Sequence, residues 1–135
     1  MSIDGAFDSQ NLIFWDPLQK QYFFYFRISE EGRATSPDFL TWPNGQSIDT
    51  GESTKEHLYT NATIPYFRAP HLYLAFPMRY VPNRAPFVNV IRPDVGDAVF
   101  MFSRDGVHFS RRYMKAFMRP GPDPRNWTKH SMIIA

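Results

Sequence analysis

Short hydrophobic runs separated by polar, proline-containing turns follow one another along the first third of the chain. Residues 11–15 (NLIFW) are mostly apolar and end at Asp16-Pro17, a common turn signal. Residues 21–27 (QYFFYFR) follow after a few polar positions and are rich in aromatic side chains, which favour strands. Two such runs joined by a short polar segment predict an antiparallel β-hairpin.

Two further segments extend this hairpin. Residues 33–36 lead into a second turn at Pro37-Asp38-Phe39, and residues 40–42 begin the return of the chain. Residues 43–56 (PNGQSIDTGESTKE) are polar and contain glycine, so we expect a connection with at most one edge strand. The pattern therefore predicts a meander of four short strands, or nearly four.

The same order of segments recurs in the second half of the chain. Residues 59–66 (YTNATIPY) and 71–76 (HLYLAF) correspond to the first two strands when Asn61 is set on Asn11, an offset of 50. Setting both segments at this offset places Tyr73 on Phe23. We therefore expect a second unit built like the first.

The turn pattern Ser-x-Asp-x-x-x-aromatic also occurs twice. It begins at Ser36 and again at Ser103, an offset of 67. The growth of the offset from 50 to 67 predicts an insertion of 17 residues between the second and third strands of the second unit. Residues 79–96, with three prolines, are expected to hold this insertion as a long loop.

A repeat of about 50 to 70 residues with four short strands is typical of one blade of a β-propeller. We therefore expect an all-β fold of about two four-stranded antiparallel blades: a blade over 1–55, a blade over 56–123, and the start of a next blade over 124–135. Two blades cannot close a ring. We expect one partial propeller domain, either a piece of a longer propeller or a unit that copies assemble to complete.

Composition supports the all-β class and excludes some functions. Aromatic residues make up 17% of the chain and it contains 12 prolines, so long helices are disfavoured. The absence of cysteine excludes disulfides and thiolate metal sites. The net charge is only +2, the densest basic tract (Arg104 to Arg119) is expected to be a solvated strand face, and no nucleic-acid partner is expected.

The sequence also lacks targeting signals for a membrane. The N-terminal segment MSIDGAFDSQ has neither the basic region nor the apolar core of a signal peptide. No apolar run approaches membrane-spanning length. We expect a soluble protein with no membrane partner, and a cysteine-free chain suits both the cytosol and export.

The segment 103–109 (SRDGVHF) places Ser, Asp and His close together, as a catalytic triad would. A triad holds its base between the other two groups, and we expect Ser103, Asp105 and His108 to be too close on an extended turn to converge. A tight turn needs the same residue types, because Asp accepts backbone N–H groups and Gly106 supplies positive φ. The four histidines lie singly, so no zinc site is expected, and we expect no cofactor.

Two acids precede the first strand of their own units: Asp8 in FDSQN and Glu56 in KEHLYTN. In a propeller, the first strands line the central channel, so residues at their leading ends converge on one mouth. Two carboxylates there, one protonated and one ionised, suit the cleavage of a glycosidic bond, and Asn11 and Asn61 are candidates to bind sugar hydroxyls. The alternative is that Asp8 caps a strand and Glu56 is a solvated loop acid.

Arg68 and Arg79 flank the ends of predicted strands. Arg79 is a candidate to contact a hydroxyl or carboxylate group of a ligand. The alternative for both arginines is a structural partnership with Asp side chains or backbone carbonyls.

The segments FDSQNLIFWDPLQKQYFFYFR and RATSPDFLTW resemble blades of the five-bladed propeller glycosidases, the clan of glycoside hydrolase families 32 and 43. The chain is most similar to a branch of family-32-like bacterial proteins with FDSQN…FWD, HLYTN…PY and SRDG-x-x-F segments. The resemblance spans nearly the whole chain and covers the middle of a full propeller.

The resemblance implies a carbohydrate-active protein in which three acids at inner-strand starts share the chemistry. Asp8 resembles the aspartate that stabilises the transition state, and Glu56 is similarly placed to the general acid. Asp8 stands between Phe7 and Ser9, whereas the clan has an Arg-Asp-Pro context. The blade with the nucleophile is expected to lie outside this chain, so hydrolysis is expected of the full-length relative rather than of the chain alone.

The alternative function is a non-catalytic propeller whose mouth holds a carbohydrate or serves an interaction. For an enzyme or a carbohydrate-binding propeller, the expected partner is a saccharide, as substrate or as ligand. Copies of the chain could also associate through open blade edges.

Overall fold

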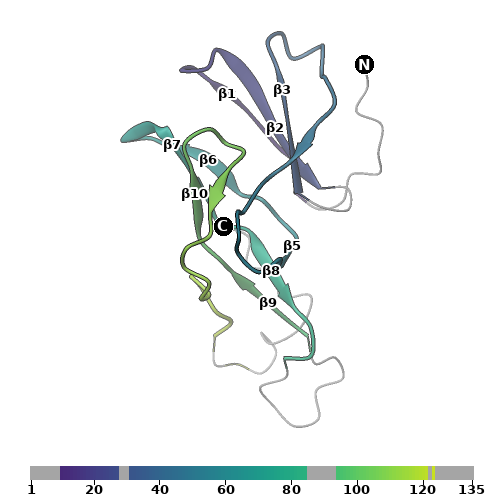
Figure 1. Ribbon diagram of the computed structural model, residues 1–135, viewed down its shortest axis with the longest axis vertical. Coiled ribbons are helices and arrows are strands. Elements are labelled where there is room, and N and C mark those ends of the chain that lie inside the picture. The colour runs from purple at the N-terminus through teal and green to yellow at the C-terminus, as the bar shows by residue number, and fades with distance from the viewer. Residues whose placement is uncertain (1–9, 28–30, 85–93, 122, 124–135) are drawn as a thin grey trace.

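The computed structural model describes residues 10–27, 31–84, 94–121 and 123. Every regular element in these residues is a β-strand, and the strands form three antiparallel sheets (Figure 1), which confirms the all-β class. The described residues contain no closed sheet, so a propeller stays a prediction. Within the same residues, no helix is long and apolar enough to cross a membrane.

The first sheet contains β1 (Leu12–Asp16), β2 (Gln21–Arg27), β3 (Glu31–Ser36) and β4 (Gln46–Ser47) in chain order. Neighbouring strands are antiparallel, so the predicted hairpin and the four-strand meander are confirmed. The turn between β1 and β2 is held by Asp16, whose Oδ1 accepts the N–H groups of Leu18 and Gln19, both at 2.8 Å. An aspartate followed by proline therefore fixes the turn.

The second sheet repeats this order with β6 (Thr63–Tyr66), β7 (Ala69–Ala75), β10 (Met101–Ser103) and β11 (Phe109–Ser110). A third sheet lies towards the lower end of Figure 1 and contains β5 (His57–Leu58), β8 (Met78–Val81) and β9 (Val95–Ala98). The second and third sheets both lie in the segment 56–123. The segment 124–135, predicted to begin a next blade, lies outside the described residues.

The third sheet corrects two expectations. Residues 79–96 were expected to be one long loop, but β8 and β9 occupy its two ends and pair with each other. Pro77 and Pro82 stand on either side of β8, so these prolines mark the ends of a strand instead of excluding one. The first strand of the second unit, expected over 59–66, begins only at Thr63, because the chain still pairs with the third sheet at Tyr59, whose N–H donates to the Met78 carbonyl at 2.8 Å.

The predicted repeat is visible in how the strands pair. Three side chains, one from each of the first three strands, form a row across each four-stranded sheet: Trp15–Tyr22–Ser36 in the first and Pro65–Tyr73–Ser103 in the second. The offsets of 50 and 67 for the outer members of the row agree with the prediction. The middle strand has an offset of 51, and the expected 50 is wrong, because the register of the β6–β7 hairpin shifts by a bulge between Pro65 and Tyr66.

The hydrophobic core lies between the first and second sheets. Its buried members are Phe23, Tyr25, Tyr73, Ala75, Met101 and Phe109. The rings of Phe23 and Tyr73 stack with their centroids 5.5 Å apart. At about 25 cal/mol per Å², burial of an aromatic side chain of this size stabilises the fold by roughly 2 kcal/mol.

The two Ser-x-Asp turns share one geometry, as the sequence predicted. Asp38 Oδ1 accepts the N–H groups of Leu40 and Thr41, and Asp105 Oδ1 accepts those of Val107 and His108, all at 2.7 to 2.9 Å. The second of these turns packs against the first sheet. Its Gly106 carbonyl accepts the Tyr25 hydroxyl at 2.8 Å, and its Asp105 carbonyl accepts Arg33 Nη1 at 3.0 Å.

The segment that leaves β4 also pairs with the second sheet. Asp49 N–H donates to the Val107 carbonyl at 2.9 Å, and Phe109 N–H donates to the Asp49 carbonyl at 2.7 Å. Asp49 thereby forms a parallel bridge with His108 at the edge of β11. The outer edge of β11 is therefore covered by the segment that follows β4.

We expect Gly106→Ala to lower the free energy of unfolding by about 2 to 3 kcal/mol. Gly106 has φ of +76°, and an added Cβ would lie 2.6 Å from the Tyr25 hydroxyl oxygen. Gly51→Ala is the matched control, because Gly51 has φ of +68° but nothing within 4 Å of an added Cβ. We expect the control to lose only about 1 kcal/mol. Denaturant titration measures both losses, and equal values would contradict the close contact with Tyr25.

Candidate functional site

The structure places the predicted site residues in different environments. Asp8 lies outside the described residues. Asn11 and Asn61 stand just before β1 and β6, at equivalent positions of the repeat, but Asn11 is exposed and Asn61 is buried. Glu56 and Arg79 are brought into direct contact.

Glu56 lies between two guanidinium groups. Its Oε1 accepts Arg79 Nη1 at 2.5 Å, and its Oε2 accepts Arg111 Nε at 2.8 Å. Arg111 Nη2 also reaches Oε1 at 3.4 Å. The side chain of Glu56 is 13% exposed, so the alternative that it is a solvated loop acid is wrong.

Asp97 completes this charge network from the centre of β9. It is fully buried, and its two oxygens accept Nε and Nη2 of Arg79, both at 2.8 Å. Arg84 Nη1 approaches the same carboxylate at 3.3 Å. We call Glu56, Arg79, Asp97 and Arg111 the Glu56 network.

The sequence prediction missed Asp97 and Arg111. Asp97 stands in the apolar context VGDAV, and an acid that is buried there needs a cationic partner. The apolar neighbours of Asp97 were therefore the available sequence signal for a buried ion pair. Arg111 was included in a tract expected to be a solvated strand face, yet only 1% of its side chain is exposed. That expectation is wrong for Arg111, because Glu56 and the carbonyl groups of Tyr113 and Met114 accept its N–H groups inside the fold.

The contacts give Arg79 a mainly structural environment. Its hydrogen bond to Asp97, and next the one to Glu56, raise the pKa of Arg79 above its ordinary value, although burial acts in the opposite direction. Arg79 Nη1 also donates to the Met114 carbonyl at 3.0 Å. These contacts match the structural alternative for Arg79, and its role in substrate binding stays a prediction.

The same contacts define what Glu56 can do. Both of its oxygens accept charged N–H groups, which is the geometry of an ionised carboxylate that acts as an acceptor. A general acid must instead carry a proton on one oxygen. Glu56 would have to release one guanidinium contact to act as the predicted acid, and that role stays a prediction.

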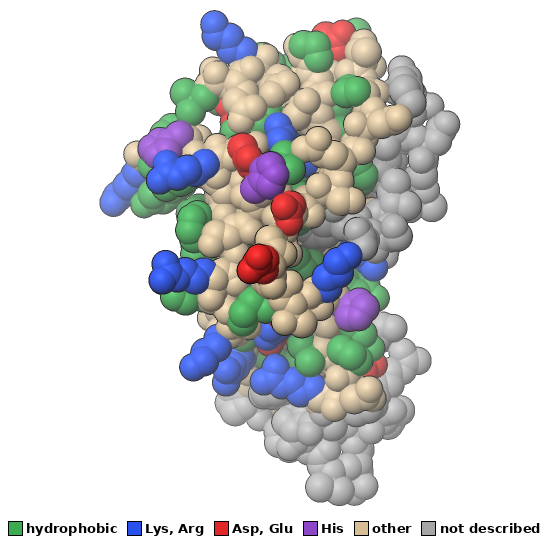
Figure 2. Space-filling model, viewed as in Figure 1, with side chains coloured by type: hydrophobic (Ala, Val, Ile, Leu, Met, Phe, Trp, Pro, Cys, Tyr) green, Lys and Arg blue, Asp and Glu red, His purple; other side chains and the backbone are tan. Residues whose placement is uncertain are grey.

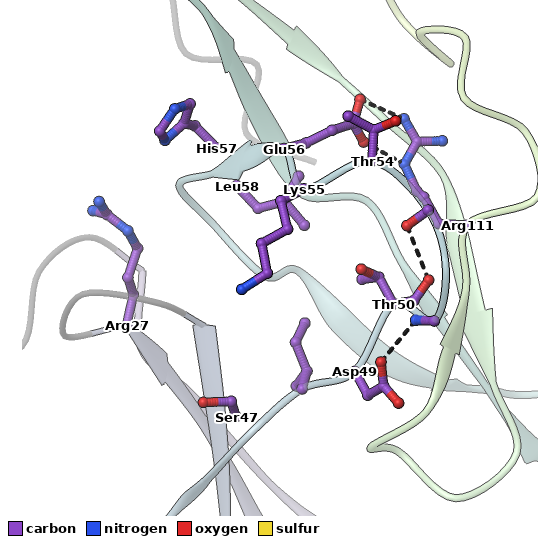
Figure 3. A pocket seen from close by; sticks show the side chains of 13 residues that line it. Arg27, Ser47, Asp49, Thr50, Thr54, Lys55, Glu56, His57, Leu58 and Arg111 are labelled. Atoms are coloured by element: carbon purple, nitrogen blue, oxygen red, sulfur yellow. Dashed lines mark hydrogen bonds and ion pairs between the residues drawn. The ribbon is translucent and has the colours of Figure 1, made fainter.

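A pocket of about 590 Å³ opens where the three sheets meet, with Glu56 and Arg111 in its wall. Its lining comes from the end of β2 (Arg27), the segment from β4 to β5, and the residue after β11. Hydroxyl groups line it at Ser47, Thr50, Ser53 and Thr54. In the view of Figure 3, Glu56 and Arg111 lie on one side and Arg27 on the other, with Lys55 between them.

The electrostatic surroundings of this pocket are mixed. Asp49 and Glu56 supply carboxylates, and Arg27, Lys55 and Arg111 supply cations. On the face of the molecule seen in Figure 2, acidic side chains lie along the middle, and basic side chains lie on both sides of them and below. Both signs of charge therefore meet a ligand that approaches this face. Within the described ranges, no group of three or more His, Asp or Glu side chains could hold a metal ion.

The side chains of Ser103, Asp105 and His108 lie closer together than expected. Ser103 Oγ donates to Asp105 Oδ1 at 3.0 Å, and Asp105 Oδ2 lies 2.6 Å from His108 Nδ1, so the three side chains do converge. The expectation that they could not meet is wrong, because the turn folds both neighbours back onto Asp105. The aspartate, not the histidine, occupies the middle position, so His108 is not placed to take a proton from Ser103.

We expect Glu56→Gln to lower the free energy of unfolding by about 3 kcal/mol, because the neutral amide leaves the buried guanidinium group of Arg111 without a carboxylate partner and Arg79 with Asp97 alone. Glu52→Gln is the control, since Glu52 is exposed in the neighbouring turn. We expect the control to change stability by no more than about 0.5 kcal/mol. Urea titration at neutral pH measures both, and a loss at Glu56 as small as the control would contradict the network.

We expect His108 to titrate above its ordinary pKa of 6.5, because its hydrogen bond to Asp105 raises the pKa of the imidazole. Since the folded value is the raised one, the stability that this pair contributes is complete below the ordinary pKa and is lost as the pH rises through the raised value. NMR titration of the ring protons measures the value. Asp105→Asn should return it towards 6.5, and Asp38→Asn, in the equivalent turn, should leave it unchanged. A wild-type value at or below 6.5 would contradict the pair.

Comparison with known proteins gives no match. No protein-family model, no curated protein and no solved structure matches this chain. The geometry of the Glu56 network and its pocket is therefore the basis on which a function can be proposed.

Proposed function

We propose that this chain is part of a carbohydrate-active protein and that the pocket beside Glu56 binds a saccharide. The observation that carries the proposal is a carboxylate fixed in the wall of a polar pocket by two guanidinium groups, at 2.5 and 2.8 Å. Sugar hydroxyls both donate and accept hydrogen bonds, so they need rigid acceptors and donors within one cavity.

The lining of the pocket suits this kind of ligand. The carboxylates of Glu56 and Asp49 accept hydroxyl protons, and the hydroxyls of Thr50 and Thr54 both donate and accept. Asp49 is itself oriented, because its Oδ1 accepts the Gly51 N–H at 2.7 Å. Ordered acceptors reduce the entropy that is lost on binding, which favours a small polar ligand.

We also propose a propeller as the complete architecture, with the two four-stranded sheets as blades. The support is that both sheets have the same strand order and equivalent rows of side chains. They also stack face to face through Phe23 and Tyr73, as neighbouring blades do. In this arrangement, the pocket lies beside the passage from one blade to the next.

Hydrolysis of a glycosidic bond is the second candidate, and one observation favours it. Two carboxylates, Asp49 and Glu56, line the same pocket, and glycosidases use a pair of carboxylates. The fixed pairing of Glu56 with Arg79 and Arg111 favours binding over proton donation. Saccharide binding is therefore the function that the geometry supports best.

We expect the wild-type chain to bind at least one member of a panel of neutral and acidic oligosaccharides, measured by isothermal titration calorimetry. Thr54→Arg should weaken that binding by about tenfold or more, because Thr54 is an exposed pocket residue and a long cation would fill the cavity. Asn44→Arg is the matched control, since it adds the same side chain at an exposed loop position outside the pocket lining.

Two results would overturn the proposal. One is that no saccharide of the panel binds to the wild type, and the other is that Thr54→Arg binds as tightly as Asn44→Arg. The same mixtures are assayed for new reducing ends, and their release by the wild type but not by Asp49→Asn would replace binding with hydrolysis as the function.

A further inference from the structure

The first sheet has an exposed hydrophobic face that points away from the core. Phe14 and Phe23 face the second sheet, so the alternation of side chains places Ile13, Trp15 and Tyr22 on the opposite side. The ring of Phe39 packs on Tyr22 with centroids 5.1 Å apart and extends this surface. Ile13 is 42% exposed, Trp15 45% and Phe39 48%. We call these four residues the outer face of the first sheet.

The second sheet has a comparable exposed face on its far side. Tyr73 and Met101 face the core, so Leu74 and Phe102 point the other way, in one row with Ile64. Phe100 lies 6.2 Å from Phe102, and Phe76 lies 5.1 Å from Phe117, measured between ring centroids. Ile64 is 55% exposed and Phe117 61%. We call the following residues the far face of the second sheet: Ile64, Leu74, Phe76, Phe100, Phe102 and Phe117.

The repeat shows what each face is shaped to contact. The row Trp15–Tyr22 of the outer face corresponds to Pro65–Tyr73, which lies on the side of the second sheet that packs against the first. Ile13 corresponds to Thr63, and Thr63 is completely buried. The outer face is therefore the counterpart of a surface that another four-stranded sheet already covers within the chain.

The far face is the counterpart of the complementary surface. Its row Ile64–Leu74 corresponds to Phe14–Phe23, which lies on the side of the first sheet that packs against the second. Each chain thus carries both halves of the internal sheet-to-sheet contact a second time, one on each side of the stack. A surface and its complement on opposite sides of one molecule make a head-to-tail contact between identical copies.

We propose that copies of this chain associate head to tail, with the far face of the second sheet of one copy on the outer face of the first sheet of the next. The new contact repeats the internal contact between the two sheets. It is heterologous, so it adds copies until a ring closes or a filament grows. This proposal does not depend on saccharide binding.

One pair of residues in the internal contact has different residue types at the equivalent positions of the proposed contact. Inside the chain, the Tyr25 hydroxyl meets Gly106. By the offsets of the repeat, Phe76 takes the place of Tyr25, and Phe39 takes the place of Gly106. The proposed contact therefore exchanges a hydrogen bond for a contact of two aromatic rings, one from each copy.

The backbone of Phe39 supports this exchange. Phe39 has φ of +66°, close to the +76° of Gly106, although a bulky side chain is unfavourable in this region. Strain of this kind is often found at positions that have a function. An aromatic ring at a strained position that is about half exposed fits a contact with another molecule.

Two single variants test the proposal. Trp15→Glu places a charge on the outer face, and Ile64→Glu places one on the far face, both at positions about half exposed. Sedimentation velocity over a wide range of protein concentration should show species larger than a dimer for the wild type and monomers for each variant. An equimolar mixture of the two variants should form dimers and nothing larger, because each retains the face that the other has lost.

Leu18→Glu is the control, because Leu18 is an exposed apolar residue in the β1–β2 turn outside both faces, and it should associate like the wild type. Phe39→Ser and Phe117→Ser are the second pair, used if either charged variant loses its fold by circular dichroism. A wild type that is monomeric at every concentration overturns the proposal. So does self-association of either face variant alone, which would indicate pairing of like faces, or a mixture that stays monomeric.

Discussion

The contact between the first and second sheets is the constraint on which the rest of the structure depends. Tyr25 is central to it, since its ring is buried in the core and its hydroxyl donates to the Gly106 carbonyl. This contact places the turn that begins at Ser103 against the first sheet. It also brings β11 beside Asp49, so that the pocket forms where the chain passes from one sheet to the next. Tyr25 thus holds the two sheets together both by the packing of its ring and by the hydrogen bond of its hydroxyl.

The sequence predicts those parts of the fold that depend on neighbouring residues. The QYFFYFR strand, the Asp16 turn and both Ser-x-Asp turns follow from local patterns, and each is present. The third sheet could not be predicted in this way, because β8 and β9 are short and separated by a proline-rich segment. The one-residue error in the offset of β7 has a similar cause, since a bulge leaves no clear mark in the sequence.

The candidate site was only partly predictable for the same physical reason. Glu56 and Arg79 could be selected as polar residues at strand ends, but their contact depends on the pairing of β5 with β8. Asp97 and Arg111 come from still more distant parts of the chain. Long-range ion pairs carry no spacing rule, so a sequence identifies their members one by one and not as a network. The acid Asp8 lies outside the described residues and stays a prediction.

The Glu56 network also holds the third sheet to the second. Its members come from the residue before β5, from β8, from β9 and from the residue after β11. A carboxylate that connects two sheets in this way is held rigidly by the fold itself, as the proposed binding of a ligand requires. Binding requires both Glu56 oxygens to stay fixed as acceptors, whereas acid catalysis requires one of them to carry a proton, so the two roles make opposite demands on Glu56.

The bridge between Asp49 and β11 has a consequence for the order in which the protein can fold during synthesis. Asp49 leaves the ribosome well before Phe109, its hydrogen-bonding partner, and the separation between Tyr25 and its partner Gly106 is longer still. Because a nascent chain grows from its N-terminus, the aromatic residues of the first sheet emerge before the second sheet that covers them. Contacts between such distant residues also slow folding, since a long loop has to close before they form. The N-terminal half is therefore the part of this protein that would most need protection by a chaperone.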